Sequence, residues 1–498
     1  MMLPLMNPRV RWGAAVVVVW LAICVPLAAA DILPQVDYPA HLARVHLLAG
    51  DLPGAELFYR PSWAILPNLA LEIVCVPLSA VLPAPIALRI FVAILLGLLV
   101  WGGALLSRAA AGRVTPLAFL PALLAYNVIL AFGFLNFLFG LGLALVALAR
   151  HIEGRDDPLR RRLLRESAFA LALFASHIVA LAVYLLAAAV HDLAARRPGL
   201  RRDVAVLAAA LVAPFLLLLA SPTRREATLL ALHPLSAKID KLVTVLETGQ
   251  GVWDTVFAIA ALAFVIALLL FRFARVSRPL ALVALALAAA FVIAPYSFAS
   301  AENIDTRLPV VFLAVFLAAF ELTCTGARAR AVVAVLAALF MFRIVTTTVH
   351  HARAARALAA VRADLEAAVP AGSLVFTARE LSAPTWQPDD WRPPLFHAPA
   401  LLLLDRPVYL QMLFVHPTQQ PLARTAPFAA LDLADLVGVV RQPHLEAYGE
   451  NLHRLLDAER RAEPAYVFFL KGRGRLIAGP HFDVLIDRPR YAILRLRE

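Results

Sequence analysis

Apolar residues dominate the first part of the chain and occur in runs long enough to cross a bilayer. A spanning helix needs about 20 mostly apolar residues, and a hairpin of two half-spanning helices needs fewer in each arm. Runs of these kinds lie at roughly 12–30, 86–106, 116–131, 133–149, 167–190, 203–220, 253–271, 279–297, 308–325 and 331–349. The pattern predicts a mostly α protein, a polytopic transmembrane helix bundle.

Arginines gather between these runs. Because Lys and Arg favour cytoplasmic loops, the clusters predict which ends of the helices face the cytoplasm. The clusters are Arg108 with Arg113, residues 150–165, 196–202 and 272–278, and Arg328 with Arg330. This assignment gives about eleven crossings, with the N-terminus inside and the C-terminus outside.

Two segments do not read as simple spans. Residues 62–83 are apolar but contain three prolines and a glutamate, and a crossing there would place Arg108 and Arg113 outside. We expect an interfacial or re-entrant segment on the outer face. Residues 167–190 have arginines on both flanks, so we expect two short helices that break near Ser176 and His177, with His177 at the outer surface.

After about residue 350 the composition changes. Charged, proline and aromatic residues become more frequent, and no apolar run is long enough to cross a membrane. The periodicity predicts strands at 373–377, 408–414, 465–470 and 491–496, and helices at 353–368 and around 445–460. The predicted organisation is a transmembrane module at 1–350, with outer loops 31–85, 221–252 and 298–307, and a C-terminal extracytoplasmic α/β domain at 351–498.

The composition agrees with a membrane protein. The 498 residues are 62% hydrophobic and 16% charged, whereas soluble proteins carry about 25% charge. The net charge of +12 does not indicate nucleic acid as a partner, because the basic residues fall mostly between apolar runs. The three cysteines lie in apolar stretches and have no metal-ligand or redox spacing.

The densest group of polar side chains lies just after the first apolar run, at Asp37, Tyr38, His41 and Arg44. If a helix begins near Pro39, His41 and Arg44 share one face and Asp37 stands at its start. Two interpretations stay open for Asp37. It is a helix cap, or it is a carboxylate presented to a substrate that arrives from the membrane.

Other polar residues map to the same outer face. They are His177, Lys238, Glu302, Asp305 and Arg307. The group at 302–307 is either a solvated turn or part of an acceptor or phosphate site. The adjacent pair His350 and His351 does not predict a metal site, because neighbouring residues do not face each other on a helix. For His397 and His416 we expect a surface or packing role.

This arrangement resembles the GT-C glycosyltransferase superfamily, which includes protein O-mannosyltransferases, aminoarabinose transferases and oligosaccharyltransferase catalytic subunits. The shared features are an acid in the first outer loop, an interfacial segment, many spans and a C-terminal outer α/β domain. The amino-acid sequence of residues 37–44, followed by Pro67-Asn68-Leu69-Ala70, is also similar to the corresponding sequence in a group of uncharacterised bacterial membrane proteins.

The resemblance implies a polyprenyl-phosphate-linked sugar as donor, an extracytoplasmic acceptor (a glycan, lipid or protein) and a site in the bacterial inner membrane. It implies direct attack with inversion, with Asp37 as general base. The leaving lipid phosphate needs cations, and these would come from the outer-face residues His41, Arg44, His177, Lys238 and Arg307, while Glu302 and Asp305 would line the acceptor or phosphate site. Many members carry paired acids in this loop, but Asp37 has no acidic neighbour, so a divalent cation (Mg²⁺ or Mn²⁺) stays an open expectation.

The alternative function is a non-enzymatic membrane protein for lipid-linked saccharide transport or envelope assembly. A transporter is expected to show paired repeats or interrupted helices with charges at the midplane. Here the polar residues gather at one face of the membrane, and this asymmetry favours an interfacial active site.

Overall fold

The computed structural model describes residues 8–195, 199–225, 230–298, 302–380, 383, 394–432, 438–440, 445–472 and 476–497. Residues 196–198, 226–229 and 299–301, which belong to a predicted inner loop and two predicted outer loops, lie outside this part of the chain. The contacts divide the chain into two compact units. The first contains Met1–Ala29, Ala64–Ile73 and Arg89–His350, and the second contains Ala30–Trp63, Val74–Leu88 and His351–Glu498.

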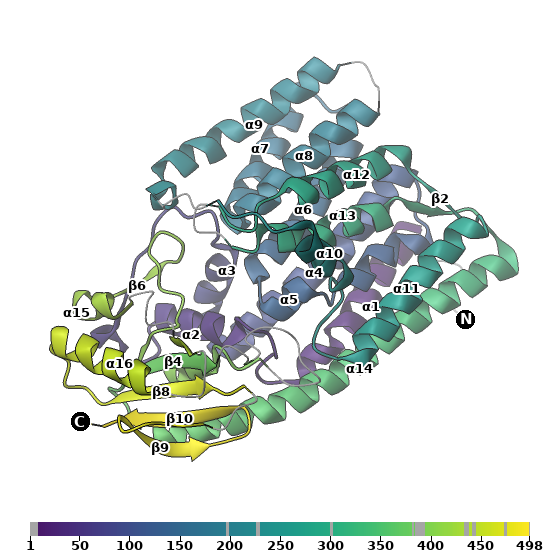
Figure 1. Cartoon of the computed structure of the whole chain (residues 1–498). Coiled ribbons are helices and arrows are strands. Elements are labelled where there is room, and N and C mark those ends of the chain that lie inside the picture. The colour runs from purple at the N-terminus through teal and green to yellow at the C-terminus, as the bar shows by residue number, and fades with distance from the viewer. Residues whose placement is uncertain are drawn as a thin grey trace. The chain divides into compact units, whose positions relative to one another are not determined.

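Helices make up the first unit, and most of them are apolar (Figure 1). The helices that belong to it wholly or in part are α1 (Pro8–Cys24), η1 (Val25–Ala29), α3 (Ala70–Ser79), α4 (Ala84–Ala111), η3 (Pro116–Leu124), α5 (Val128–Phe132), α6 (Leu135–Glu153), α7 (Leu159–Ser176), α8 (Ile178–Ala194), α9 (Leu200–Ala220), η4 (Pro222–Arg225), α10 (Leu235–Val243), α11 (Val252–Leu270), α12 (Arg278–Ile293), α13 (Ile304–Ala318) and α14 (Gly326–Ala368). The short strands β2 (Ala274–Val276) and β3 (Phe320–Leu322) pair antiparallel.

Six helices in the described part of the chain are long and apolar enough to cross a membrane: Val10–Ala29, α4, α6, α9, α11 and α14. Other predicted runs form shorter apolar helices, such as α8 with 17 residues and α12 with 16. A 17-residue helix rises about 25 Å, close to the hydrocarbon thickness of about 30 Å. The mostly helical, multi-helix architecture is therefore confirmed, and the number of crossings stays a prediction.

The structure bears out the predicted break in the run 167–190. Helix α7 ends at Ser176, α8 begins at Ile178, and His177 between them is extended, with φ −170° and ψ 126°. In contrast, the predicted span 331–349 and the predicted helix 353–368 are one continuous helix, α14, of 43 residues. No proline or glycine follows Gly326 within it, so nothing in the local sequence ends the helix earlier.

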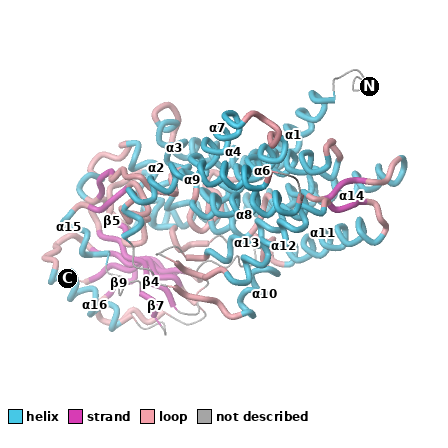
Figure 2. The backbone as a smooth tube through the Cα atoms, turned by 90° about the horizontal axis from the view of Figure 1, so that it is seen from above, coloured by secondary structure: helices cyan, strands magenta, loops and turns pink. Residues whose placement is uncertain are grey.

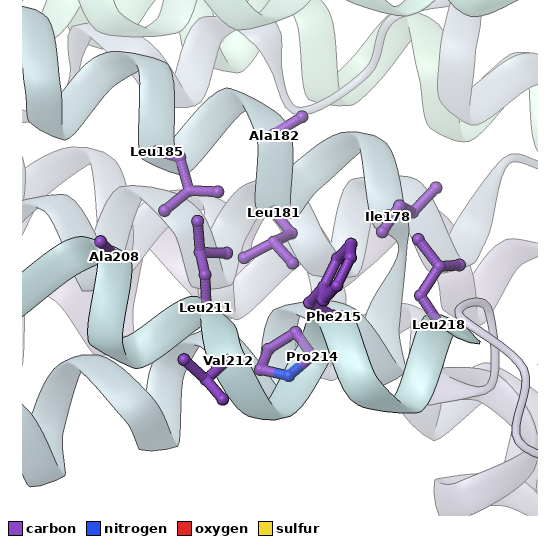
Figure 3. A pocket seen from close by; sticks show the side chains of 10 residues that line it. All are labelled: Ile178, Leu181, Ala182, Leu185, Ala208, Leu211, Val212, Pro214, Phe215 and Leu218. Carbon is purple, nitrogen blue, oxygen red and sulfur yellow. The ribbon is translucent and has the colours of Figure 1, made fainter. Parts of the chain in front are cut away.

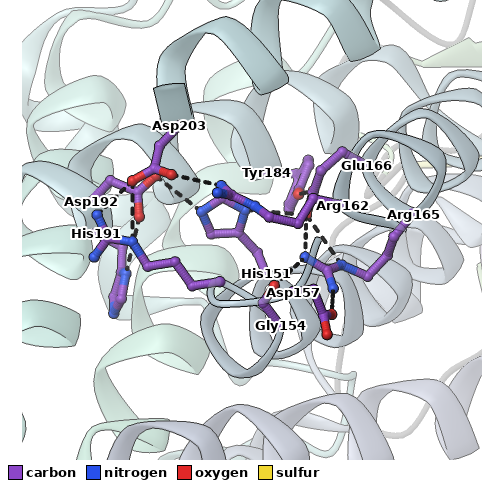
Figure 4. A network of polar contacts seen from close by, with 11 residues as sticks. His151, Gly154, Asp157, Arg162, Arg165, Glu166, Tyr184, His191, Asp192 and Asp203 are labelled. Carbon is purple, nitrogen blue, oxygen red and sulfur yellow. Dashed lines mark hydrogen bonds and ion pairs between the residues drawn. The ribbon is translucent and has the colours of Figure 1, made fainter. Parts of the chain in front are cut away.

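A buried ionic network joins α6, α7, α8 and α9 (Figure 4). His151 of α6 lies 3.4 Å from Glu166 of α7 and 3.1 Å from Asp192 of α8. Asp203 of α9 accepts hydrogen bonds of 2.5 and 2.6 Å from two arginines, Arg155 and Arg162. Because a buried charge without its partner costs several kcal/mol, these pairings fix the order and register of the four helices.

The second unit is built on a mixed sheet, which Figure 2 shows as the gathered magenta strands. The order is β5 (Tyr409–Leu410), β4 (Leu374–Glu380), β8 (Ala465–Leu470), β10 (Tyr491–Leu496) and β9 (Phe482–Asp487), and β7 (Gly438–Val440) also pairs with β4. Strands β5, β7 and β8 run parallel to β4, whereas β10 is antiparallel to β8 and β9. The elements after α14 are β4 (Leu374–Glu380), η5 (Ala398–Leu404), β5 (Tyr409–Leu410), β6 (Leu422–Arg424), α15 (Ala426–Ala429), η6 (Ala430–Asp432), β7 (Gly438–Val440), α16 (Glu446–Ala458), β8 (Ala465–Leu470), β9 (Phe482–Asp487) and β10 (Tyr491–Leu496).

The most apolar predicted strand occupies the middle of this sheet. All six residues of β8 are buried, as expected for a strand covered on both faces. The predicted strands 465–470 and 491–496 match β8 and β10, and the predicted helix near 445–460 is α16. Strand β9 was not predicted, because four of its six residues are exposed and its pattern does not alternate.

Part of the first outer loop folds into the second unit. It supplies α2 (Tyr38–Ala49), η2 (Ala55–Leu57) and β1 (Tyr59–Pro61). Strand β1 pairs antiparallel with β6, and helix α2 packs on η5. The Tyr59 hydroxyl donates to Val408 O at 3.1 Å and accepts from Leu410 N at 2.7 Å, which ties the loop to the chain beside β5.

Candidate functional site

Helix α2 presents the polar group that opens the first outer loop. The helix begins at Tyr38 with Pro39 in its first turn, where a missing N–H costs nothing. Arg44 Nη2 lies 3.0 Å from His41 Nδ1, so these side chains share a face as predicted. Asp37 occupies the N-cap position, but its side chain makes no capping hydrogen bond to the helix. The predicted position of Asp37 at the start of the helix is therefore confirmed, without a side-chain capping bond.

The Asp37 carboxylate instead lies beside an imidazole from the C-terminal domain. His397 precedes η5, and its Nε2 is 3.5 Å from Asp37 Oδ1. The Phe414 ring contacts both histidines, with ring centroids 4.8 Å from His397 and 5.7 Å from His41. His397 is 5% exposed, whereas the Asp37 side chain is 14% exposed and can be reached from solvent.

Burial determines the protonation state of the His397 imidazole. It lowers the pKa of His397 to about 4, although a hydrogen bond to the Met412 carbonyl acts in the opposite direction. The imidazole is therefore neutral at neutral pH. From the sequence we expect only a surface or packing role for His397. No local sequence signal indicates its contact with Asp37. His416 in contrast bonds locally, with Nδ1 2.7 Å from Thr418 Oγ1.

A second group of polar side chains lies in the first unit, around the break between α7 and α8. The backbone of Leu69 donates to Ala175 O at 2.7 Å, and Ile178 N donates to Pro67 O at 3.2 Å. Asn136 Oδ1 accepts from Leu71 N at 2.7 Å, and its Nδ2 donates to the Asn68 carbonyl at 2.9 Å. These bonds satisfy backbone groups at the start of α3 and dock the predicted interfacial segment on the break.

Arg307 and His177 meet on one aromatic ring. The guanidinium of Arg307 lies 5.8 Å from the Phe137 ring and 4.5 Å from the Phe134 ring. His177 contacts Phe137 edge to face at 5.5 Å. Arg307 Nη1 also donates to the Glu302 carbonyl at 2.8 Å, so the backbone, not the carboxylate, of Glu302 holds it. These contacts place a cation beside the extended residue at the break.

Lys238 and Asp305 belong to a third group. Asp305 is fully buried and contacts Lys241 at 2.5 Å, His233 at 3.1 Å and Lys238 at 3.5 Å. Burial raises the pKa of Asp305, but the hydrogen bonds from Lys241 and His233 outweigh it, so the pKa lies below its ordinary value. Lys238 also donates to two backbone carbonyls at the end of α12, at 2.8 and 2.9 Å. These three oxygens account for its three donors, which favours a structural role for this ammonium.

The predicted site residues thus fall into the two units. Asp37, His41 and Arg44 belong to the second, and His177, Lys238, Glu302, Asp305 and Arg307 to the first. Sequence reasoning missed the functional interest of His397 and Phe414. It also gave no indication that Asn136 bonds the start of α3. A buried asparagine at a helix start is a weak signal, because only the partner segment reveals what it bonds.

The described residues contain no group of three or more His, Cys, Asp or Glu side chains that is arranged to hold a metal ion. The divalent cation stays a prediction.

The whole chain is similar in fold to ArnT from Cupriavidus metallidurans. The crystal structure of ArnT bound to undecaprenyl phosphate matches with a TM-score of 0.55 and 14% identity, over 97% of this chain and 98% of that chain. The apo structure of ArnT matches with a TM-score of 0.54 and 14% identity, over 98% of both chains. No known family model matches the chain, and no curated protein does. At this level of identity the likeness shows the fold alone, and that fold agrees with the predicted whole-chain architecture of a helical module followed by a small sheet domain.

Proposed function

We propose that this protein is an inverting GT-C-type glycosyltransferase that moves a sugar from a polyprenyl-phosphate-linked donor to an extracytoplasmic glycan, lipid or protein. The observation that carries the proposal is the whole-chain likeness in fold to ArnT, a structure of which holds undecaprenyl phosphate. The local support is Asp37, a partly exposed carboxylate that is not engaged in capping its helix.

Asp37 acts as the general base in this proposal. It takes the proton of the acceptor hydroxyl while the acceptor oxygen forms a bond to the anomeric carbon. The bond between that carbon and the phosphate oxygen breaks on the opposite face, and its electron pair leaves with the lipid phosphate. The anomeric configuration is therefore inverted.

The leaving phosphate needs cations in a region of low dielectric constant. Arg307, which is 8% exposed, and Arg44, which is fully buried, are the proposed phosphate-side cations, helped by His177 and His41. In this proposal Lys238, Asp305 and Glu302 support the segment that carries Arg307, at the start of α13.

An apolar groove supports a lipid-linked donor. It lies between α8 and α9, has a volume of about 380 Å³ and is lined only by apolar side chains (Figure 3). Ile178, at one end of its lining, directly follows His177, whose ring shares Phe137 with Arg307. An apolar groove suits an isoprenoid chain, and a cation on the ring that His177 also contacts suits its phosphate head. Pro214 lines the groove from within α9 and interrupts the hydrogen bonds of that helix.

The proposed setting is the bacterial inner membrane, with about eleven crossings, a cytoplasmic N-terminus and an extracytoplasmic C-terminal domain. Helix α3 has ten residues, which rise about 15 Å and fall short of the hydrocarbon core of about 30 Å. This length favours an interfacial segment at 62–83. Cysteines introduced at 66 and 84 should then both react with an impermeant reagent added from outside, and reaction of 84 only from the cytoplasm contradicts the topology.

The decisive variant is Asp37→Asn, with Asp51→Asn as its control. The amide keeps the shape of Asp37 but cannot accept the proton, and loss of a general base costs about 10²–10⁴-fold in rate. Asp51 is an exposed acid just beyond the other end of α2, so its amide should leave the rate unchanged. The assay follows release of undecaprenyl phosphate from radiolabelled undecaprenyl-phosphate sugars, with purified protein and a mixture of envelope glycans, lipids and proteins.

Full activity of a folded Asp37→Asn protein would refute the assignment of the base. If wild-type protein moves the labelled donor across vesicles but transfers no sugar, the alternative function in lipid-linked saccharide transport holds instead. Treatment with EDTA, followed by Mg²⁺ or Mn²⁺, tests the proposed divalent cation in the same assay.

A further inference from the structure

His397 is a buried imidazole that faces the proposed base. It comes from the C-terminal domain, beside the first turn of η5, and the packing of α2 on η5 brings the two side chains together. The distance from His397 Nε2 to Asp37 Oδ1 is 3.5 Å. The function proposed above gives this imidazole no role.

The hydrogen bonds of His397 define which ring nitrogen carries the proton. Nδ1 lies 3.1 Å from the Met412 carbonyl oxygen. A carbonyl oxygen only accepts, so Nδ1 is the N–H donor. In a neutral imidazole Nε2 then has no hydrogen and presents a lone pair to Asp37.

The surroundings keep this imidazole neutral. The rings of Phe396 and Phe414 lie 5.0 and 4.8 Å from the His397 ring, and only 5% of the residue is exposed. The pKa of about 4 agrees with this geometry. The helix that packs on η5 also carries Arg44 and His41, whose ring lies 5.7 Å from the Phe414 ring.

A neutral Nε2 and an ionised carboxylate are both acceptors, so their contact gains a hydrogen bond only when a proton lies between them. That proton arrives when Asp37 deprotonates the acceptor. We propose that His397 is a positioning residue that accepts a hydrogen bond from Asp37 once Asp37 holds the proton of the acceptor hydroxyl.

This inference rests on the proposed function, and the step balances without a further reagent. The acceptor O–H bond breaks, the proton goes to Asp37 Oδ1 and is shared with His397 Nε2, and solvent removes it after the lipid phosphate has left. The hydrogen bond exists after proton transfer and not before it. It therefore stabilises the transition state more than the ground state, which raises kcat and leaves KM unchanged.

The first test compares His397→Phe, His397→Gln and the control His416→Phe in the sugar-transfer assay. Phenylalanine keeps the ring packing but removes the acceptor, so we expect kcat to fall about tenfold, the worth of one hydrogen bond to a group that changes its charge, with KM unchanged. The acidic limb of the pH–rate profile should move to lower pH, because the protonated form of Asp37 loses its acceptor. Glutamine restores an acceptor oxygen, so its kcat should be intermediate, and His416→Phe should match the wild type.

The second test measures the interaction between Asp37 and His397 directly and needs no sugar transfer. In ¹⁵N spectra of the whole protein in detergent, assigned with His397→Phe, Nδ1 should be protonated and Nε2 unprotonated at pH 7. Asp37→Asn brings an amide donor to Nε2 and should move its resonance upfield, whereas Asp51→Asn should leave it in place.

The proposal is overturned if Nε2 is protonated at pH 7 or does not respond to Asp37→Asn. It is also overturned if His397→Phe keeps the wild-type kcat and acidic limb, or if both His397 variants lose activity equally together with thermal stability. If wild-type protein transfers no sugar, the proposed function fails, and the spectra still decide whether Asp37 and His397 interact.

Discussion

Gly140 of α6 lies where that helix meets the start of α8, and adding one methyl group there should destabilise the first unit. A Cβ built on Gly140 would lie 2.7 Å from the Ala180 Cβ, 3.4 Å from the Ser176 Cβ and 3.6 Å from the His177 Cβ. Ordinary contacts begin at 3.4 Å, so α6 and α8 must separate by about 0.7 Å (3.4 minus 2.7) to restore ordinary contact in Gly140→Ala. The displaced segment is the one that carries His177.

Two opposing terms set the magnitude. Overpacking of this kind costs about 1–3 kcal/mol, whereas Ala in place of Gly in a helix gains about 1 kcal/mol. We therefore expect Gly140→Ala to lower the free energy of unfolding by about 0–2 kcal/mol. The substitution Ala180→Gly removes the opposing methyl group, so in that background Gly140→Ala should stabilise by about 1 kcal/mol. The coupling between the two sites is then about 1–3 kcal/mol.

The assay is thermal unfolding in detergent of the wild type, both single variants and the double variant. A change of 1 kcal/mol moves Tm by about 2 °C in a unit as large as the first one. Gly13→Ala in α1 is the matched control, because its added Cβ has nothing within 4 Å and the substitution should stabilise. The close approach of α6 and α8 is refuted if Gly140→Ala stabilises as much as Gly13→Ala, or if the effects of the two sites simply add.

Three further predictions concern stability. Asp203→Ala leaves Arg155 and Arg162 buried without their carboxylate, so we expect a loss of about 3–5 kcal/mol, measured as a fall in Tm, and an equally stable variant would contradict it. Tyr59→Phe leaves two buried backbone groups without their partner, so the second unit should lose about 2–6 kcal/mol and become easier to cleave by protease, while unchanged cleavage counts against this tie. Asp305 has a lowered pKa, so its contribution is present above its ordinary value of 3.8 and is lost as the pH falls through the folded value. The Tm difference between wild type and Asp305→Asn should therefore shrink below about pH 4, and a constant difference from pH 6 to 3 would argue against these hydrogen bonds.

Local sequence patterns were enough to predict much of the helical architecture. The run length of apolar residues located α4, α6, α9 and α11, and arginines on both flanks of one run located the break at His177. The fully apolar run 465–470 identified the central strand of the second unit. These features depend on neighbours within a few residues, and that is why periodicity and length are enough to predict them.

The candidate site could be predicted only in part, because its contacts join segments that are distant in the chain. The sequence singled out Asp37, and it placed His41 and Arg44 on one helical face because the spacing of three is local. It did not predict that Asn136 bonds the start of α3, since a side-chain amide at a helix start has no preferred partner until another segment packs there.

Local patterns along the chain thus indicated the membrane class, the main helices, the α/β nature of the C-terminal domain and the acid in the first loop. Three features came from the packing of distant segments: β1 pairs with β6, Lys238 lies against Asp305 and His397 faces Asp37. The physical reason is that burial and pairing between distant residues depend on how whole elements pack, and a buried charge or imidazole takes its role from the partner that packing supplies.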